Sequence, residues 1–315
     1  MYGTVKAAAL PLNKELCRIP HRRRPRLTAL GVVLGLLCPV LLFSAVCYLM
    51  CSEFRYLHGI WSYSLCAAAL GIVVYLGAMV RKTWYSVDKE GYHKDITWNL
   101  LLFLATLGAW VGAVIVGTRI FYNTTVPYND ILRLDNYAEV DPSTMRGQSY
   151  MDAGRIRFVE DAKLDLEKPM GFKNLDTYCV APIVRTGHAT EVYDFWAIGL
   201  NCCDKHTYDP RRASSQLRPS GPYQCGEYEN AMAKSGLRLL RADQREFYRL
   251  AVQEAESAYG IRSDYPLFFY WEEDVDAALK TYLTEGHDFF LMAIATHFCI
   301  QALLVVLTVV GVGLL

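Results

Sequence analysis

The sequence predicts a membrane protein in which a four-helix transmembrane bundle carries an α+β domain inserted between the third and fourth spans. Three observations lead to this fold class. The chain of 315 residues is 53% hydrophobic, and its mean hydropathy is positive. It contains four long runs without a charged residue, and a polar segment of 165 residues separates the third run from the fourth. About 20 apolar residues suffice to cross a hydrocarbon core of about 30 Å as a helix, so each run is expected to span.

The expected domain boundaries follow the four runs. They are a basic N-terminal segment at 1–26, the first three spans within 27–122 (about 27–50, 61–80 and 98–116), an outer domain at 123–287 and the fourth span at 288–315. A cleaved signal peptide is the alternative for the first run. That run is longer than the apolar part of a signal peptide, so a retained anchor is the preferred interpretation.

The basic residues predict which side of the membrane each segment occupies. Seven Lys and Arg but only one acid precede residue 27, and the loop at 81–97 carries four more Lys and Arg. Cytoplasmic loops are enriched in Lys and Arg. We therefore expect both termini in the cytoplasm of a plasma membrane or endomembrane protein, and residues 123–287 outside or in a lumen.

Small residues repeat along two of the expected spans, at the spacing of one helix face. They are Gly31 and Gly35 in the first span, and Ala105, Gly108, Ala109, Gly112, Ala113 and Gly117 in the third. Small side chains let helix backbones approach closely within a membrane. Packing within the bundle is the preferred interpretation, and a face for dimerisation is the alternative.

Two polar residues fall inside the expected fourth span, where His297 and Gln301 share a helix face. A polar side chain at membrane depth is costly and therefore a functional candidate. The simpler interpretation is an interhelical hydrogen bond. No expected span carries an Asp, Glu, Lys or Arg at mid-depth, so a transport pathway would lack its usual groups.

The outer segment has the patterns of an α+β domain. Alternating or continuous apolar residues predict strands, and apolar residues at helical spacing predict helices. The expected strands are 155–159, 163–168, 177–184 and 192–200, and 266–271 is either a further strand or an aromatic packing segment. The expected helices are 243–259 and 272–283. Asp243 and Glu246 are expected to cap the first of these helices and Gly260 to end it. The strands at 177–184 and 192–200 are apolar on both faces, which is typical of central strands.

Four cysteines belong to this outer domain, namely Cys179, Cys202, Cys203 and Cys225. An oxidising compartment favours disulfides, and a bond between adjacent cysteines is strained. We therefore expect Cys179 to pair with Cys202 or Cys203 and Cys225 with the other, each bridge contributing roughly 3 kcal/mol. A Zn or Cu site of Cys202, Cys203 and His206 is one alternative, although adjacent cysteines are not the usual zinc spacing. A catalytic thiol is the other.

The remaining motifs are weak. Asn123 begins a glycosylation sequon, but it lies about seven residues beyond the third span, close to the membrane surface. The sequence contains no GxSxG, HExxH, P-loop or GxGxxG motif. We therefore predict no catalytic residues, no metal ligands and no cofactor.

Charge restricts the class of partner. Residues 123–287 carry a net charge of −7 and the rest of the chain +7. Nucleic-acid binding needs clustered positive charge, so nucleic acid is not an expected partner. The lipid bilayer is one expected partner. A protein partner, or self-association through the spans or the outer domain, is the other.

Several strings in the outer domain resemble a known family. They are NLDTYCVAPIV, YDFWAIGLNCC, CGEYEN, GLRLLRADQREFYRLAVQEAESAYGI and PLFFYW, within residues 120–285. They are similar to an uncharacterised family of multi-pass membrane proteins abundant in dinoflagellate algae. This resemblance implies a membrane protein and no particular activity. The layout is also similar to that of tetraspanins, but Asp204 follows the cysteine pair where tetraspanins have glycine, so that likeness is one of layout only.

The leading hypothesis is a non-enzymatic membrane protein whose outer domain recognises a partner or ligand or organises a membrane assembly. A membrane-anchored enzyme with an outward active site is the alternative, and a transporter subunit using His297 and Gln301 is a third class. An exposed apolar patch would favour the first, and a polar cleft with perturbed ionisable groups the second.

Overall fold

The computed structural model describes residues 29–86, 97–203 and 222–314. The predicted basic segment at 1–26, most of the loop at 81–97 and His206 lie outside these ranges. The chain divides into two compact units. Residues up to Arg119 and from Phe289 onward form a helical unit, and Ile120–Asp288 form a sheet unit.

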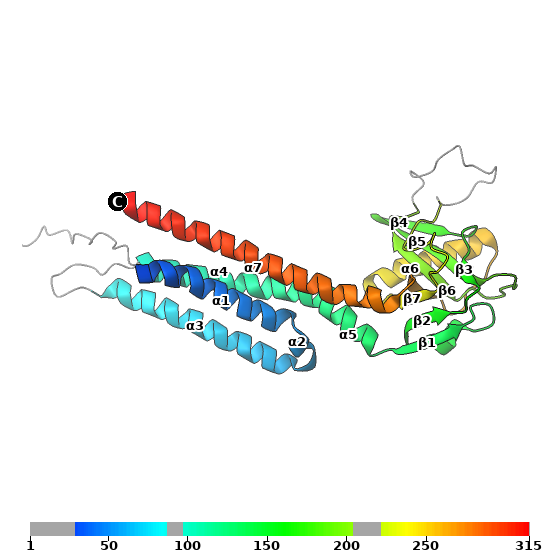
Figure 1. The fold of residues 1–315 in the computed structure, drawn as a ribbon, viewed down its shortest axis with the longest axis horizontal. Coiled ribbons are helices and arrows are strands. Elements are labelled where there is room, and N and C mark those ends of the chain that lie inside the picture. The colour runs from blue at the N-terminus through cyan, green and yellow to red at the C-terminus, as the bar shows by residue number, and fades with distance from the viewer. Residues whose placement is uncertain (1–28, 87–96, 204–221, 315) are drawn as a thin grey trace, which may run out of the picture. The chain divides into compact units, whose positions relative to one another are not determined.

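Four helices in the described ranges are long and apolar enough to cross a membrane. They are α1 (Ala29–Cys51), α3 (Gly59–Tyr85), α4 (Thr97–Ile120) with its continuation, and α7 (Val275–Leu314) (Figure 1). A short helix, α2 (Glu53–Leu57), connects α1 to α3. A π-helical segment, Phe121–Thr125, leads from α4 into α5 (Val126–Leu132). The prediction of four apolar helices is confirmed.

The last helix differs from the prediction. The sequence suggested a separate helix at 272–283, but α7 is one helix of 40 residues. Gly286 lies within it, at a point where a Cβ atom would come within 2.8 Å of the Thr124 hydroxyl oxygen. The glycine therefore gives room to a neighbouring turn and does not end the helix.

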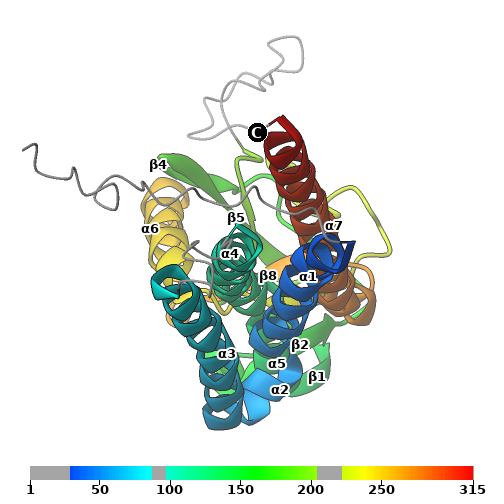
Figure 2. The same cartoon turned by 90° about the vertical axis from the view of Figure 1, so that its left-hand side faces the viewer.

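Helix α1 is the centre of the helical unit. Its buried residues recur every three to four positions and are Gly35, Pro39, Phe43, Val46, Cys47 and Met50. From α4, Gly117 approaches so closely that a Cβ atom there would lie 2.6 Å from the Met50 Cβ. From α7, Val305 approaches Gly35, and Trp110 of α4 donates a hydrogen bond to the Cys66 carbonyl of α3 at 3.1 Å. Figure 2 shows these helices nearly end-on.

The sheet unit lies between α4 and α7 in the sequence and contains one mixed sheet. Its strands are β1 (Asp135–Val140), β2 (Ala153–Phe158), β3 (Ala162–Leu164), β4 (Met170–Asn174), β5 (Asp176–Arg185), β6 (Phe195–Leu200), β7 (Ser235–Arg238) and β8 (Leu267–Glu272). The order is β1-β2-β7-β8-β6-β5-β3, and β4 also pairs with β5. Five of these strands overlap predicted ones. β1, β4 and β7 were missed, and β3 is shorter than the prediction of 163–168.

The sheet is curled. β2 and β3 lie near opposite ends of the strand order, yet only three residues connect Phe158 to Ala162. So short a connection requires the two edges to approach each other. The side chain of Arg185, at the end of β5, joins them by hydrogen bonds to Asp141, which follows β1, at 2.8 Å and to Asp161, in the connection, at 2.7 Å.

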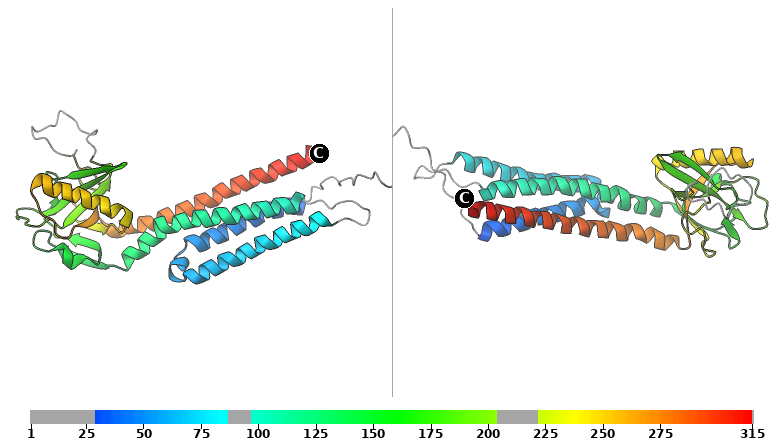
Figure 3. Two further views of the ribbon diagram at one scale, coloured as in Figure 1. Left: turned by 180° about the vertical axis from the view of Figure 1, so that it is seen from behind. Right: turned by 90° about the horizontal axis from the view of Figure 1, so that it is seen from above.

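Helix α6 (Ala242–Tyr259) covers the convex side of this arrangement, against β4 and β5 (Figure 3). It buries Tyr248, Ala251, Val252 and Ala255 against Tyr178, Val180, Trp196 and Phe268. Leu250 and Ala258 of the same helix are exposed. No side chain caps the N-terminus, so the expected Asp243–Glu246 capping pair is wrong. Gly260 ends the helix in the left-handed conformation, with φ of 65°, as predicted.

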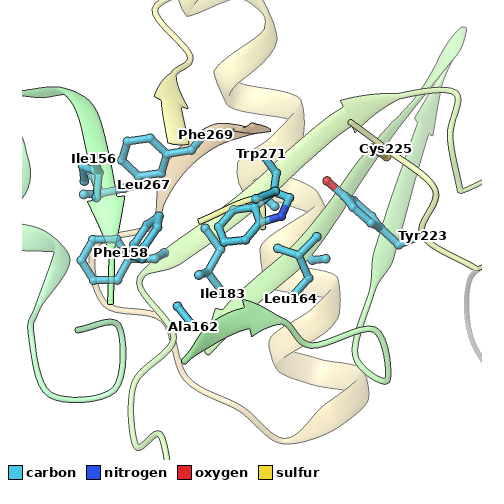
Figure 4. Close-up of a cluster of buried hydrophobic side chains, with 14 of the residues drawn as sticks. Ile156, Phe158, Ala162, Leu164, Ile183, Tyr223, Cys225, Leu267, Phe269 and Trp271 are labelled. Atoms are coloured by element: carbon cyan, nitrogen blue, oxygen red, sulfur yellow. The ribbon is translucent and has the colours of Figure 1, made fainter. Parts of the chain in front are cut away.

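The opposite face forms the interior of the curl and is filled by large apolar side chains. Phe158, Trp271, Ile183 and Leu164 point toward one another there (Figure 4). Phe158 makes edge or tilted contacts with the rings of Phe195, Phe269 and Trp271. Fully buried aromatic side chains of this size contribute strongly to stability. The residues on this face are held in place by the curled sheet and by a disulfide-linked segment that includes Cys225.

Candidate functional site

Cys179 lies in the middle of a row that crosses three strands. Its register partners are Gly171 of β4 and Gly199 of β6, and residues opposite each other in antiparallel strands point to the same face. A Cβ atom at Gly171 would lie 2.7 Å from the Cys203 sulfur, and one at Gly199 would lie 2.5 Å from the Cys202 sulfur. The two glycines therefore leave space for sulfur atoms directly against the sheet.

Two disulfides occupy this space. Cys179 bonds Cys203 with a Cα–Cα distance of 5.8 Å, and Cys202 bonds Cys225 with a Cα–Cα distance of 5.2 Å. Both distances are within the usual range for disulfides. The prediction of disulfides in this domain is confirmed, and the structure supplies the pairing that the sequence left open.

The four sulfur atoms form one cluster. The sulfurs of Cys179, Cys202 and Cys225 lie within 4.8 Å of one another, and Cys203 is bonded to the first of them. Such a group of thiolates could hold a metal, but here each sulfur is part of a disulfide and a metal needs the thiolate form. His206, which the suggested metal site combined with Cys202 and Cys203, lies outside the described residues.

Beside this cluster, the residue that connects β4 to β5 has a strained backbone conformation. Leu175 has φ of +60° and is 98% exposed. The left-handed conformation costs a residue with a side chain roughly 1–2 kcal/mol, and Gly, Asn or Asp normally takes such a position. Leu200, at the end of β6, is also exposed, and its register partner is Tyr178 of β5. Two exposed leucines thus lie at the same end of the sheet as the disulfides.

Asn201 fixes this end of the sheet. Its side-chain oxygen accepts a hydrogen bond from the Thr177 N–H at 2.8 Å, and its amide donates to the Asp176 carboxylate at 2.9 Å. Asn201 itself has φ of +57°, a conformation that asparagine tolerates. We call Leu175, Asp176, Leu200 and Asn201, with the disulfides beside them, the stapled tip. The sequence carries no signal for it, because positive φ at a leucine cannot be read from residue patterns.

An ionic network lies at the other end of β5. The Arg185 guanidinium donates to the Asp161 carboxylate at 2.7 Å and to the Asp141 carboxylate at 2.8 Å, so it joins the two edges of the curled sheet. Burial alone would raise the pKa of Asp141. Hydrogen bonds from Ser143 and from Arg185 outweigh burial and lower that pKa to about 2. The same ion pairs raise the pKa of Arg185.

A buried carboxylate organises the loops of the sheet unit. Asp194, which is 1% exposed, accepts hydrogen bonds from the N–H groups of Gly147, Asp264 and Tyr265 at 2.8 to 2.9 Å. These residues come from two loops far apart in the sequence. A fully satisfied buried carboxylate of this kind holds structure in place, and we assign it no catalytic role.

In the helical unit, Gln301 of α7 is fully buried and donates a hydrogen bond to the Gly35 carbonyl of α1 at 2.5 Å. Pro39 lies four residues after Gly35 and has no N–H, so the helix cannot satisfy that carbonyl by itself. Gln301 supplies the missing donor. A polar residue at this position in α7 is therefore explained by the proline in α1. The sequence pattern of α7 alone does not show this, because the proline is on another helix.

His297 lies one turn before Gln301. Its ring stacks on Phe43 of α1, with the ring centroids 4.3 Å apart and an interplanar angle of 10°. Its Nε2 atom is buried without a hydrogen-bond partner among the described residues. Both polar residues of the predicted intramembrane pair therefore face α1.

An arginine for which the sequence pattern predicts no structural role is buried at the connection between α1 and α3. Arg55 is 6% exposed and donates to the Met50 carbonyl at 2.9 Å, to the Tyr63 hydroxyl at 2.9 Å and to the Thr118 hydroxyl at 3.3 Å. The Met50 carbonyl lies at the C-terminal end of α1, where a cation is favourable. Arg55 therefore caps the C-terminal end of α1 and links it to α3 and α4.

The remaining predicted positions are placed as follows. Ala105, Ala109 and Ala113 are buried in α4, Gly112 contacts Phe43, Gly117 contacts Met50, and Gly35 contacts Leu101 and Val305. Gly108 faces open space and Gly31 is half-buried. Asn123 lies exposed in the π-helical segment.

The chain was compared with protein families, curated proteins and solved structures. No family model, no curated protein and no solved structure matched it. Its function therefore has to be argued from its own residues.

Proposed function

We propose that the protein is an integral, multi-pass membrane protein whose sheet domain lies outside the cytoplasm and recognises a protein partner through the stapled tip. The four candidate spans support the membrane part of the proposal. The two disulfides support an oxidising compartment for the sheet domain, because such bonds persist outside the cytosol. The basic residues before and between the first spans support cytoplasmic termini.

Leu175 is the observation that carries the recognition role. In the free domain its side chain is 98% exposed and its backbone is in a costly conformation, so the leucine contributes neither packing nor local stability. Strain that the surrounding structure holds in place is found preferentially at functional sites. Burying an exposed apolar side chain lowers the free energy, and here only the surface of another molecule can bury it.

Rigidity supports the same role. The Asn201 hydrogen bonds and the two disulfides fix the backbone on both sides of Leu175 and Leu200. A surface that is rigid before binding loses less conformational entropy on association. Two fixed leucines beside the Asp176 carboxylate suit a partner with an apolar pocket and a hydrogen-bond donor or a positive charge at its rim.

The test is site-specific photo-crosslinking in the native membrane. A photoreactive residue replaces Leu175 in the full-length protein, and Met232, which is 69% exposed elsewhere on the domain, is the matched control position. We expect a discrete protein adduct from position 175, none from 232, and loss of the adduct in the Leu200→Asp variant. Equal, diffuse crosslinking from both positions would overturn the recognition role.

Topology is tested separately with an impermeant maleimide of high mass on sealed cells. The outer cysteines should be labelled only after reduction, because all four are in disulfides. Labelling that requires opening the membrane as well would place the domain in a closed compartment. Labelling without reduction would contradict the disulfides themselves.

A further inference from the structure

We propose that the two disulfides form one thiol–disulfide exchange site, in which a dithiol reductant acting on Cys202–Cys225 causes Cys225 to displace Cys203 from Cys179. The product is a new Cys179–Cys225 bridge and a free dithiol at the adjacent Cys202 and Cys203. This inference goes beyond partner recognition, and it holds whether or not the stapled tip binds a protein.

The distances between the sulfurs are the first observation. Exchange requires a thiolate to reach a disulfide sulfur directly. The sulfurs of Cys179, Cys202 and Cys225 lie within 4.8 Å of one another, so small side-chain rotations bring the atoms of the two bridges into contact.

The two glycines are the second observation. Gly199 is the register partner of Cys179, and a Cβ atom there would come within 2.7 Å of the Cys225 sulfur. Gly171, the partner on the other side, would meet the Cys203 sulfur at the same distance. Glycine at both positions keeps the path between the bridges free of side-chain atoms.

Burial sets the order of the steps. Cys202 is partly exposed, whereas Cys179, Cys203 and Cys225 are at most 2% exposed. An external dithiol can therefore reach Cys202 first. Its thiolate attacks the Cys202 sulfur, forms a mixed disulfide and releases the Cys225 thiolate inside the cluster.

The released Cys225 thiolate then attacks the Cys179 sulfur. The Cys179–Cys203 bond breaks, the Cys179–Cys225 bond forms, and Cys203 leaves as a thiolate that takes up a proton. The second thiol of the reductant resolves the mixed disulfide and releases Cys202. The balance is two electrons and two protons from one dithiol, which becomes a disulfide, while the protein exchanges two bridges for one bridge and two thiols.

The rearrangement has a structural consequence at the stapled tip. Cys202 and Cys203 follow Asn201 directly and are anchored by both bridges before exchange. After exchange neither is anchored, while β5 is linked to Cys225. The segment after β6 is therefore released, and it carries two adjacent thiols able to bind a trivalent arsenical.

The experiment maps disulfides in the full-length protein in detergent after one equivalent of dithiothreitol. Acid quenching stops exchange because it protonates thiolates, and alkylation followed by peptide mass spectrometry identifies each bridge. We expect a Cys179–Cys225 cross-linked peptide, N-ethylmaleimide on both Cys202 and Cys203, and capture of this species by immobilised phenylarsine oxide. An intact Cys179–Cys203 bridge with only Cys202 and Cys225 alkylated would overturn the proposal.

Two serine variants give a test without added reductant. In Cys202→Ser the Cys225 thiol is free from the start, so Cys179–Cys225 should form and Cys203 should be alkylated. In Cys225→Ser the attacking thiol is absent, and Cys179–Cys203 should persist. Rearrangement to Cys179–Cys202 in that variant would overturn the assignment of Cys225. If either variant fails to fold, disulfide mapping of the unaltered protein after dithiothreitol is the test of the proposal.

Discussion

The most buried amide of the helical unit and the most buried carboxylate of the sheet unit bond the backbone in opposite directions. In the helical unit Gln301 donates to the Gly35 carbonyl, as Arg55 does to the Met50 carbonyl and Trp110 to the Cys66 carbonyl. In the sheet unit the buried carboxylate of Asp194 accepts from three backbone N–H groups. The two units therefore use different kinds of side chain at their structural centres.

The difference follows from what the backbone leaves free. A helix uses its N–H groups internally, but each carbonyl has a second lone pair, so a neighbouring helix can contribute only donors. Loops that connect strands leave N–H groups unpaired, and an acceptor such as a carboxylate satisfies several at once. Four substitutions test this comparison, beginning with the largest expected effect.

The largest effect is expected from Asp194→Ala. The substitution leaves the N–H groups of Gly147, Asp264 and Tyr265 without their acceptor, and we expect it to lower the free energy of unfolding of the sheet unit by about 3–5 kcal/mol. Pulse proteolysis of the full-length protein in a urea series measures this change.

The matched control is Asp264→Ala, which keeps the backbone N–H and removes only a side chain paired with Arg262 at the surface. It should change stability by less than about 0.5 kcal/mol. Equal effects from the two substitutions would show that Asp194 does not organise these loops.

The second-largest effect is expected on the stability of the sheet unit at acid pH. The folded-state pKa of Asp141 is lowered to about 2, and the unfolded value is about 4. Its contribution, about 2 kcal/mol, is therefore complete above the unfolded pKa and is lost as pH falls from about 4 to 2. Arg185→Met removes one of the hydrogen bonds that lower this pKa, so we expect stability to depend less on pH in that window.

Arg157→Met is the comparison for this acid effect, because its ion pair with Glu160 is exposed on both sides and contributes little. Urea midpoints from pH 2 to pH 6 measure both variants. An unchanged pH slope in Arg185→Met would mean that the guanidinium does not connect the edges of the curled sheet.

The third effect is in the helical unit. Gln301→Leu removes the donor to the Gly35 carbonyl, and interhelical hydrogen bonds of this kind contribute about 1 kcal/mol. The effect should be smaller in a Pro39→Ala background, because residue 39 then supplies an N–H to the same carbonyl. Steric trapping in micelles measures this double-mutant cycle.

Thr308→Ala is the control for the helical unit, since its hydroxyl donates to the Leu304 carbonyl of its own helix. We expect no coupling between Thr308→Ala and Pro39→Ala. If Gln301→Leu is likewise uncoupled from Pro39→Ala, the glutamine is not compensating for the proline.

The predictable parts of the fold rest on local patterns. Charge-free runs identify the spans because a membrane imposes length and composition, and the apolar strings of β5 and β6 identify buried strands. Gly260 ends α6 because its left-handed conformation is a local property. In each case neighbouring residues alone contain the signal.

The missed parts depend on residues distant in the sequence. The curl of the sheet depends on the contacts of Arg185 with Asp141 and Asp161, which are distant in the sequence. The role of Gln301 depends on Pro39, which lies on another helix. β7 was missed because its four residues, which include Gly236, have little strand propensity. The cysteines of the site were found, but their pairing required the register of β4, β5 and β6.

The smallest effect is expected at the stapled tip, and its sign is the informative part. Leu175→Asn places a residue that tolerates positive φ at a position with φ of +60°, so it should stabilise the sheet unit by roughly 0.5–1 kcal/mol. Leu175→Gly should stabilise less, because glycine also gains entropy in the unfolded chain. Met232→Asn, at an exposed position without positive φ, should be neutral.

A stabilised Leu175→Asn variant that no longer crosslinks to a partner would separate the two roles of this position, since the leucine would then be costly to the fold and necessary for recognition. Loss of stability in Leu175→Asn would mean that the side chain packs within the protein and does not await another surface.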